Sequence, residues 1–141
     1  MQRDRIVTAR LWLSNAETDL ALAVEIVDRY ASRSAFHARQ AAELALKAAL
    51  IAIADDHPRT HVGGDLIKEL GGLGEAVPAD VVAAANRLDL FYMGSRCPDA
   101  VGGADPRAVI GASEAAAAVN HARAVLAYAR TRIDDEVVSS G

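Results

Sequence analysis

The chain has 141 residues, of which 52% are hydrophobic but only 4% are aromatic, and it carries a formal net charge of −4. This length predicts one domain over residues 1–141, and the acidic balance argues against a broad surface for DNA or RNA, which is usually basic, while leaving room for a local basic patch. A single cysteine, Cys97, excludes an intramolecular disulfide and fits a cytoplasmic protein.

Two long helices are expected in the first part of the chain. Apolar residues at steps of three and four predict a first helix from Ile6 to Tyr30. Its start is amphipathic rather than uniformly apolar, so we expect neither a signal peptide nor a membrane span. Ser34 is a plausible N-cap for a second helix that runs to about Ala54 and must end before Pro58, because proline disfavours helical geometry in the residue before it.

The rest of the chain predicts three further helices. A short one is expected over Asp65–Leu70, before a glycine pair, and a longer one begins near Pro78. The pair Asp105-Pro106 is a helix start signal and predicts a last helix to about Ile133, while residues 137–141 are expected to fray. Nothing favours a strand, so the predicted fold is all-α, an up-and-down bundle of four long helices plus one short helix.

Apolar side chains lie outside one narrow stripe on the expected long helices. Examples are Trp12, Leu22 and Ile26 in the first helix and Leu46 and Leu50 in the second. Such a surplus is typical of a homodimer face, but equally of the wide core stripe of a small bundle. Both interpretations stay open at the level of sequence.

An ordered polar row follows one side of the expected second helix. It consists of Gln40, Glu43 and Lys47, with Arg39 four residues before Glu43. One interpretation is a solvated row of ion pairs, each worth a few tenths of a kcal/mol. The other is that Gln40, Glu43 and Lys47 point into a groove of the bundle and organise a polar site.

The segment from Arg96 to Asp99 lies in the loop before the last expected helix. An arginine near a helix N-terminus can hold a phosphate through paired charged hydrogen bonds, to which backbone amides add. The alternative is a turn in which Arg96 pairs with Asp99. Cys97 has no histidine next to it in the sequence that would make it a nucleophile.

The histidines of the loop do not predict a metal site. His57 and His61 are four residues apart, but Pro58 stands between them, so they do not share a helix face, and no further ligand completes a site. We expect Thr60 and His61 to close the loop and cap the third helix instead. The glycine pairs lack a phosphate-loop context, and we expect no cofactor.

Several of these segments together resemble the HEPN family, small helical-bundle proteins of bacteria and archaea with some eukaryotic members. Each motif alone is weak, but their order and spacing over most of the chain are fairly specific. The last one resembles the family's common Arg-Tyr-Pro-Asp turn, with Cys97 in place of the aromatic residue. The resemblance is carried by Trp12, Ala16, Asp19, Leu20 and Ala23, by the block from Phe36 to Lys47, by Pro58, Thr60, His61, Leu66 and Leu70, and by Leu88, Tyr92 and Arg96 to Asp99.

The resemblance implies an up-and-down bundle that is usually a homodimer, with one of three kinds of function. Some members are metal-independent RNases, often toxins, in which an Arg and a His four to six residues later meet their dimer mates and cut RNA through its 2′-hydroxyl. Others are proposed to bind nucleotides. Others again act as partners of a small nucleotidyltransferase encoded beside them.

The histidine of the RNase members is missing at that spacing, because the residues after Asp99 are Ala100, Val101, Gly102 and Gly103. Loss of a general acid or base typically costs about 10²- to 10⁴-fold in rate. We therefore expect a homodimeric binding module for a nucleotide or RNA phosphate, with a nucleotidyltransferase as partner and with neither DNA nor a membrane. An RNase toxin and a purely structural interaction bundle are the alternatives. The expected ligand-binding residues are Arg96, Asp99, Gln40, Glu43 and Lys47.

Overall fold

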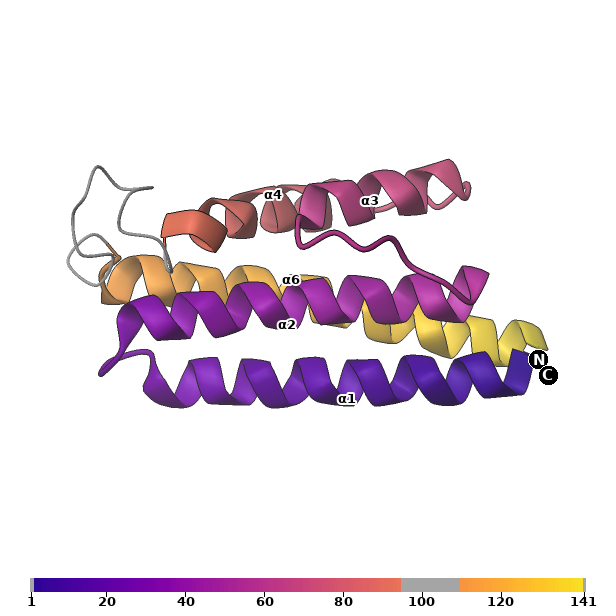
Figure 1. Cartoon of the computed structure of the whole chain (residues 1–141), viewed down its shortest axis with the longest axis horizontal. Helices are drawn as coiled ribbons and strands as arrows, with labels where there is room; N and C mark the ends of the chain where they lie inside the picture. The colour runs from indigo at the N-terminus through magenta and orange to yellow at the C-terminus, as the bar shows by residue number, and fades with distance from the viewer. Residues whose placement is uncertain (1, 95–109, 141) are drawn as a thin grey trace.

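The computed structural model describes residues 2–94 and 110–140, which form an all-α bundle without strands in these ranges (Figure 1). Three long helices lie lengthwise beside one another, and two shorter helices cover one side of them. None of the described helices is long and apolar enough to cross a membrane. The helices are α1 (Gln2–Ile26), α2 (Ala31–Ala54), α3 (Gly63–Gly72), α4 (Ala79–Gly94) and α6 (Ala112–Ser140).

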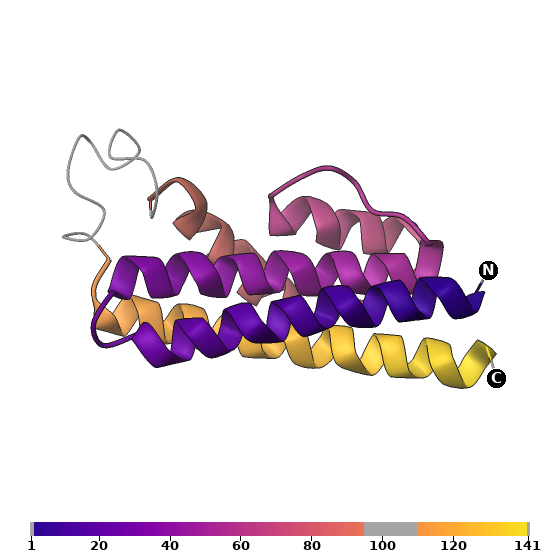
Figure 2. The same cartoon turned by 60° about the horizontal axis from the view of Figure 1, so that its bottom comes forward.

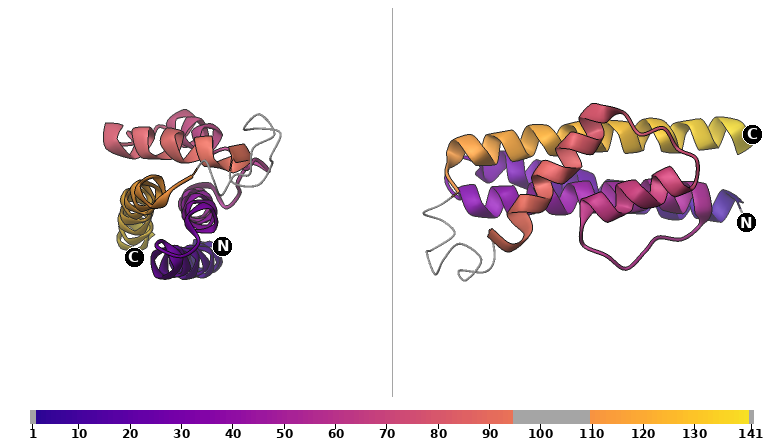
Figure 3. Two further views of the ribbon diagram at one scale, coloured as in Figure 1. Left: turned by 90° about the vertical axis from the view of Figure 1, so that its left-hand side faces the viewer. Right: turned by 90° about the horizontal axis from the view of Figure 1, so that it is seen from above.

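Helix α2 is the centre of the arrangement. It packs against α1 along its length and also contacts α3, α4 and α6. Seen along the bundle, α2 lies between α1 on one side and the layer of α3 and α4 on the other, with α6 beside it (Figure 3). Helix α2 is therefore surrounded by other helices over much of its circumference.

The connection between α2 and α3 runs back along α2 rather than turning tightly. Residues 55–62 return over the middle of α2, so that α3 then runs in the same direction as α2 (Figure 1). Short connections favour antiparallel neighbours, as α1 and α2 are, but this eight-residue return lets α3 lie parallel to α2. Both ends of the described chain lie at the opposite end of the bundle from the α1–α2 turn (Figure 2).

The core is built largely from alanine. Most alanines of α2 are fully buried, and their small side chains let neighbouring helices approach closely. Larger side chains fill the spaces between helices. The largest fully buried apolar ones are Leu46, Leu50, Leu66, Leu70, Leu88, Leu126, Ile133 and Val125.

The helix boundaries around the first turn differ from the prediction. Helix α1 ends at Ile26, so Tyr30 is exposed rather than on the core stripe. Helix α2 begins at Ala31, three residues before Ser34, so Ser34 is not its N-cap. The Ser34 hydroxyl instead donates to the carbonyl of Ala23 at 2.6 Å, which ties α2 to α1. Serine suits both roles, because its short hydroxyl can bond to a backbone group either of its own helix or of a neighbour.

The end of α2 agrees with the prediction. The helix stops at Ala54, and Asp55 follows in the left-handed conformation with φ of 61°. Asp tolerates this conformation better than most residues, and its amide bonds to the carbonyl of Ile51, as is common after a helix.

The last helix also differs from the prediction at both ends. The predicted start at Asp105-Pro106 lies outside the described residues, and the described helix begins only at Ala112, after the non-helical Ile110 and Gly111. At the other end, α6 continues to Ser140, beyond the predicted end near Ile133 and into the segment expected to fray.

The surplus of apolar residues has two explanations in this fold. Leu46 and Leu50 are fully buried within the chain, so on α2 the surplus is core. On α1 the surplus apolar residues are partly in the core and partly on the surface. Trp12 and Ile26 are partly buried, whereas Leu22 is exposed, as are Val7 and Leu11.

Candidate functional site

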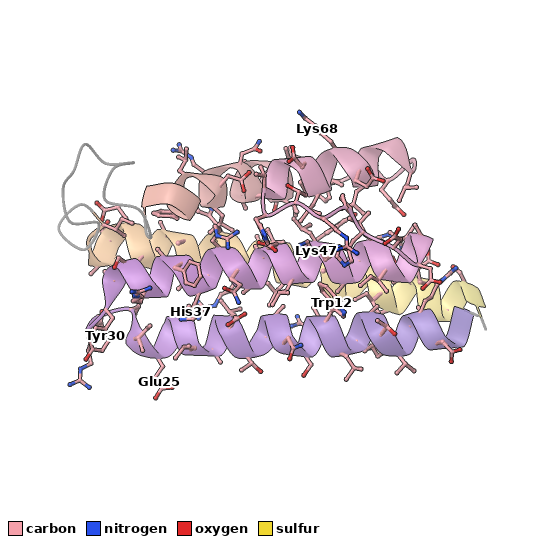
Figure 4. All side chains as sticks on the ribbon, in the orientation of Figure 1. Trp12, Glu25, Tyr30, His37, Lys47 and Lys68 are labelled. Atoms are coloured by element: carbon pink, nitrogen blue, oxygen red, sulfur yellow. The ribbon has the colours of Figure 1, made fainter. Side chains whose placement is uncertain are left out.

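A buried group of charged side chains lies on the side of α2 that faces α3 and α4. Arg39, Glu43 and Lys47 are only 4%, 7% and 6% exposed. The interpretation of this row as solvated ion pairs is therefore wrong. Figure 4 shows Lys47 on the side of α2 toward the returning loop.

Glu43 is the centre of this group. Its Oε1 accepts a hydrogen bond from Arg39 Nη1 at 2.9 Å, and its Oε2 accepts one from Lys47 Nζ at 2.9 Å. The Nδ1 atom of His61 lies 3.1 Å from the same Oε2. Burial raises the pKa of Glu43, but the hydrogen bonds from Lys47, Arg39 and His61 outweigh it, so the pKa is lowered overall. Glu43 is thus held as an anion.

The same side chains fasten the returning loop to α2. Arg39 Nη1 also donates to the carbonyl oxygen of His61 at 3.0 Å, while the His61 ring contacts Glu43 and is itself 64% exposed. Arg39 and Glu43, one helical turn apart on α2, therefore hold the backbone and the ring of His61, respectively. We name Arg39, Glu43, Lys47 and His61 the Glu43 cluster.

The expectation that Thr60 caps α3 directly is wrong. Its hydroxyl accepts from the amide of Val62 at 3.1 Å and donates to Asp65 Oδ2 at 2.9 Å, which forms a tight turn before the helix. The N-cap residue of α3 is Val62, whose side chain makes no cap hydrogen bond.

The cap comes from another helix. Asp89 of α4 accepts hydrogen bonds from the amides of Gly63 at 2.7 Å and Gly64 at 2.9 Å. A Cβ on Gly63 would meet Asp89 Oδ1 at 3.2 Å, so glycine allows this close approach. Sequence reasoning missed Asp89, because its partner amides lie about 25 residues earlier in the chain.

Little free space remains at the Glu43 cluster. A cavity of about 10 Å³, lined by Arg39, Glu43, Gly63 and Asp89 among others, has room for a single water. This cavity is too small for a nucleotide.

Gln40 belongs to a different group of side chains. It lies on the side of α2 toward α1, where its Nε2 donates to Asp19 Oδ2 at 3.3 Å. His37 Nδ1 lies 3.5 Å from the other oxygen of Asp19, between the two helices (Figure 4). Burial raises the pKa of Asp19, and its contacts with His37 and Gln40 only partly offset this effect. We name these three residues the Asp19 cluster.

The predicted row is thus split. The fold brings Glu43 and Lys47 together with Arg39 and His61, and it places Gln40 on another face of the same helix. Arg96 and Asp99 lie outside the described residues. The described ranges end at Gly94, the end of α4, and resume at Ile110 just before α6, both at the end of the bundle that carries the α1–α2 turn (Figures 1 and 3).

The two loop histidines have separate surroundings. The ring of His57 packs on Trp12 of α1 with ring centroids 4.7 Å apart, whereas His61 contacts Glu43. Across residues 2–94 and 110–140, no three His, Cys, Asp or Glu side chains are grouped so that they could hold a metal ion.

Comparisons with known proteins converge on one family. The HEPN domain profile matches residues 9–132. The crystal structure of TT1696 from Thermus thermophilus has a TM-score of 0.81 and 32% sequence identity, with 88% of this chain and 97% of that chain covered. The crystal structure of ST0689, an archaeal HEPN homologue, has a TM-score of 0.74 and 27% identity, with coverage of 89% and 97%. A search of curated proteins found no significant match.

Proposed function

The chain belongs to the HEPN family, and on this basis we propose that it is a binding module for a nucleotide or RNA phosphate near Arg96. In this proposal the module is a homodimer that works with a small nucleotidyltransferase. Arg96 supports the phosphate part, because a guanidinium can hold a phosphate through paired charged hydrogen bonds.

The observation that carries the choice of a binder over an enzyme is the missing histidine at the expected spacing after Arg96. Glu43 does not replace that histidine as a base, because three donors surround its carboxylate and its pKa is lowered, so it is poorly suited to take up a proton at neutral pH. In addition, Lys47 and Arg39 are buried and engaged with Glu43. The cluster acts as scaffold for a binding site rather than as its reacting group.

Ligand binding is tested by calorimetry and melting temperature with ATP, GTP, UTP and short RNAs. We expect saturable binding of at least one of them, weakened about tenfold or more in Arg96→Ala, because a lost charged hydrogen bond contributes about 1.5–3 kcal/mol. Arg87→Ala is the control, since Arg87 is an exposed arginine of α4. If none of these ligands binds, or if Arg96→Ala binds as wild type does, nucleotide binding is refuted.

The homodimer is supported by exposed apolar residues on α1. Val7, Leu11 and Leu22 lie within about 60° of one another around the helix axis and are all exposed in the single chain. Light scattering should give the mass of a dimer for the wild type and of a monomer for Leu11→Glu. A monomeric wild type would refute the dimer, and the absence of a nucleotidyltransferase among co-purifying proteins would count against the partner.

One observation favours a second candidate, a metal-independent RNase. His61 is exposed while Glu43 contacts its Nδ1, an arrangement in which a carboxylate orients an imidazole for proton transfer. This candidate requires RNA cleavage in EDTA that is lost in both His61→Ala and Arg96→Ala. Intact RNA after prolonged incubation with the wild type would remove it. Tight co-purification with a partner, without any response to ligands, would favour a purely structural bundle instead.

A further inference from the structure

A second cavity lies at the end of the bundle, apart from the Glu43 cluster. It has a volume of about 380 Å³ and lies between the α1–α2 turn and the start of α6. It is large enough for a phosphate group with an attached sugar. The residues that matter in its lining are Arg29, Tyr30, Ser32, Arg33 and Gly111.

Two arginines without ion-pair partners in the described part of the chain lie at this cavity. Arg29 and Arg33 are exposed, and neither forms an ion pair within the described ranges. Asp28 also lines the cavity and Glu114 lies in the first turn of α6, so the formal charges of these four side chains cancel. Because the two arginines have no carboxylate partner among the described residues, their guanidinium groups are available to an anion in the cavity.

Two helices begin at the cavity wall. The first residues of α2 and of α6, Ala31 and Ala112, both line it, and the first amides of a helix lack partners within that helix. The N-cap residue of α2 is Tyr30, whose side chain makes no cap hydrogen bond. The positive ends of two helix dipoles thus meet at one place.

The hydroxyl of Ser32 adds a further donor at this cavity. Ser32 lines the cavity, is only 3% exposed as a residue, and forms no side-chain hydrogen bond among the described residues. Its Oγ is not one of the fully enclosed polar atoms that lack a partner, so water or a ligand in the cavity can reach it. The hydroxyl can donate to a phosphate oxygen while the arginines supply the charge.

Tyr30 provides an apolar surface beside these groups. Its side chain is 58% exposed and lies between Arg29 and the start of α2. An exposed aromatic ring next to a phosphate site is the arrangement on which nucleic acid bases stack. The ring therefore favours a nucleotide over inorganic phosphate alone.

From these observations we infer a second phosphate site, in which Arg29, Arg33 and Ser32 hold the phosphate of a nucleotide and Tyr30 stacks on its base. The site is formed without Arg96, so it goes beyond the function proposed above. The nucleotide can be free or can be one unit of an RNA strand, because both present the same phosphate and base.

The test is calorimetric titration of the full chain with 5′-AMP, pyrophosphate and a five-nucleotide RNA. The double variant Arg29→Ala/Arg33→Ala should weaken binding of 5′-AMP about tenfold or more, and Ser32→Ala about threefold. Tyr30→Ala should weaken 5′-AMP about fivefold and leave pyrophosphate unchanged. Tighter binding of the RNA than of 5′-AMP would assign the site to a strand, and equal binding to a free nucleotide.

Controls separate this site from the site near Arg96. Both arginines are exposed, so the double variant should keep the wild-type melting temperature, and Arg87→Ala should bind as wild type does. Amide chemical shifts of Ser32 and Gly111 should move on addition of 5′-AMP in wild type and in Arg96→Ala alike. Unchanged affinity in the double variant, or shifts that vanish in Arg96→Ala, would overturn the second site, while the proposal for Arg96 would stand or fall on its own titration.

Discussion

Two carboxylates lie on two different faces of helix α2, one from α2 itself and one from α1, and their pKa values shift in opposite directions. On the face toward α3 and α4, Glu43 is buried and has a lowered pKa. On the face toward α1, Asp19 of the neighbouring helix contacts Gln40 and His37 and has a raised pKa. Both carboxylates lose water, so burial alone does not explain the difference.

The difference lies in the donors. Glu43 has a guanidinium and an ammonium at 2.9 Å, and each is a charged donor. Asp19 has one neutral amide at 3.3 Å and an imidazole at 3.5 Å. Charged hydrogen bonds are roughly twice as strong as neutral ones. Only at Glu43 do the hydrogen bonds therefore lower the pKa by more than burial raises it. The number and charge of the donors decide whether a buried acid stabilises the fold.

Replacing Glu43 should have the largest effect on stability. Glu43→Ala leaves the buried Arg39 and Lys47 without their anion and releases the ring of His61, so we expect a loss of about 3–5 kcal/mol in the free energy of unfolding. Urea denaturation measures it, with Asp19→Ala as the matched acidic control, expected to lose less than about 1 kcal/mol. Equal losses in the two variants would contradict the comparison.

The capping carboxylate of Asp89 should rank second. It receives only neutral amides, so Asp89→Ala should cost about 1–2 kcal/mol, the usual value of a lost helix cap. Asp89→Asn keeps one acceptor and should recover part of the loss. If Asp89→Ala is as stable as wild type in urea, the contribution of this cap is negligible.

The two acids should also differ in the sign of their pH dependence. Because the pKa of Glu43 is lower in the folded chain than its ordinary value of 4.5, the ionised carboxylate stabilises the fold at pH values above 4.5. This stabilisation is lost as the pH falls through the pKa of Glu43 in the folded chain. The stability gap between wild type and Glu43→Gln should therefore narrow from pH 6 to pH 3 in urea titrations. A gap that stays constant over this range would show that Glu43 has the same pKa in the folded and unfolded chain.

The smallest effect is expected for Asp19→Asn. Because the pKa of Asp19 is raised in the folded chain, its ionised form disfavours folding. This cost appears as the pH rises through the ordinary pKa of 3.8 and is complete at pH values above the pKa of Asp19 in the folded chain. Asparagine removes the charge, so the variant should match or slightly exceed wild type at pH 7, within about 1 kcal/mol. A marked loss at pH 7 would show that the contact with His37 contributes more than burial costs.

The sequence was sufficient to predict the helices because their cores follow a regular period. The apolar steps of α1 and α6 identify Ala9, Leu13, Ala122 and Leu126, which are buried. Near the start of α6, however, the same steps taken back from Ala122 lead to Ala116, which is exposed, while its neighbour Ala115 is buried. Alanine fits either environment, so an alanine-rich helix does not fix its own rotation about its axis.

The polar site could be predicted only in part. The spacing of Arg39, Glu43 and Lys47 correctly indicated contacts within one helix, but such spacing is common on solvated surfaces too. Their burial depends on the returning loop, which no local pattern predicts. The spacing predicts Gln40 in one row with Glu43, because residues three apart lie nearly one helical turn apart. The two side chains nevertheless point in somewhat different directions around α2. Because other helices surround α2, this difference is enough for Gln40 to contact Asp19 of α1 instead of the Glu43 cluster.

The cap on α3 has a consequence for how the molecule opens. A ten-residue helix is marginal in isolation, and this one has its first two amides satisfied by a side chain of α4. Helices α3 and α4 are therefore expected to fluctuate as one cooperative unit over the rigid pair of α1 and α2. In hydrogen exchange, the amides of Gly63 and Gly64 would then share the opening free energy of α4, so that a ligand or partner that loosens one helix also frees the other.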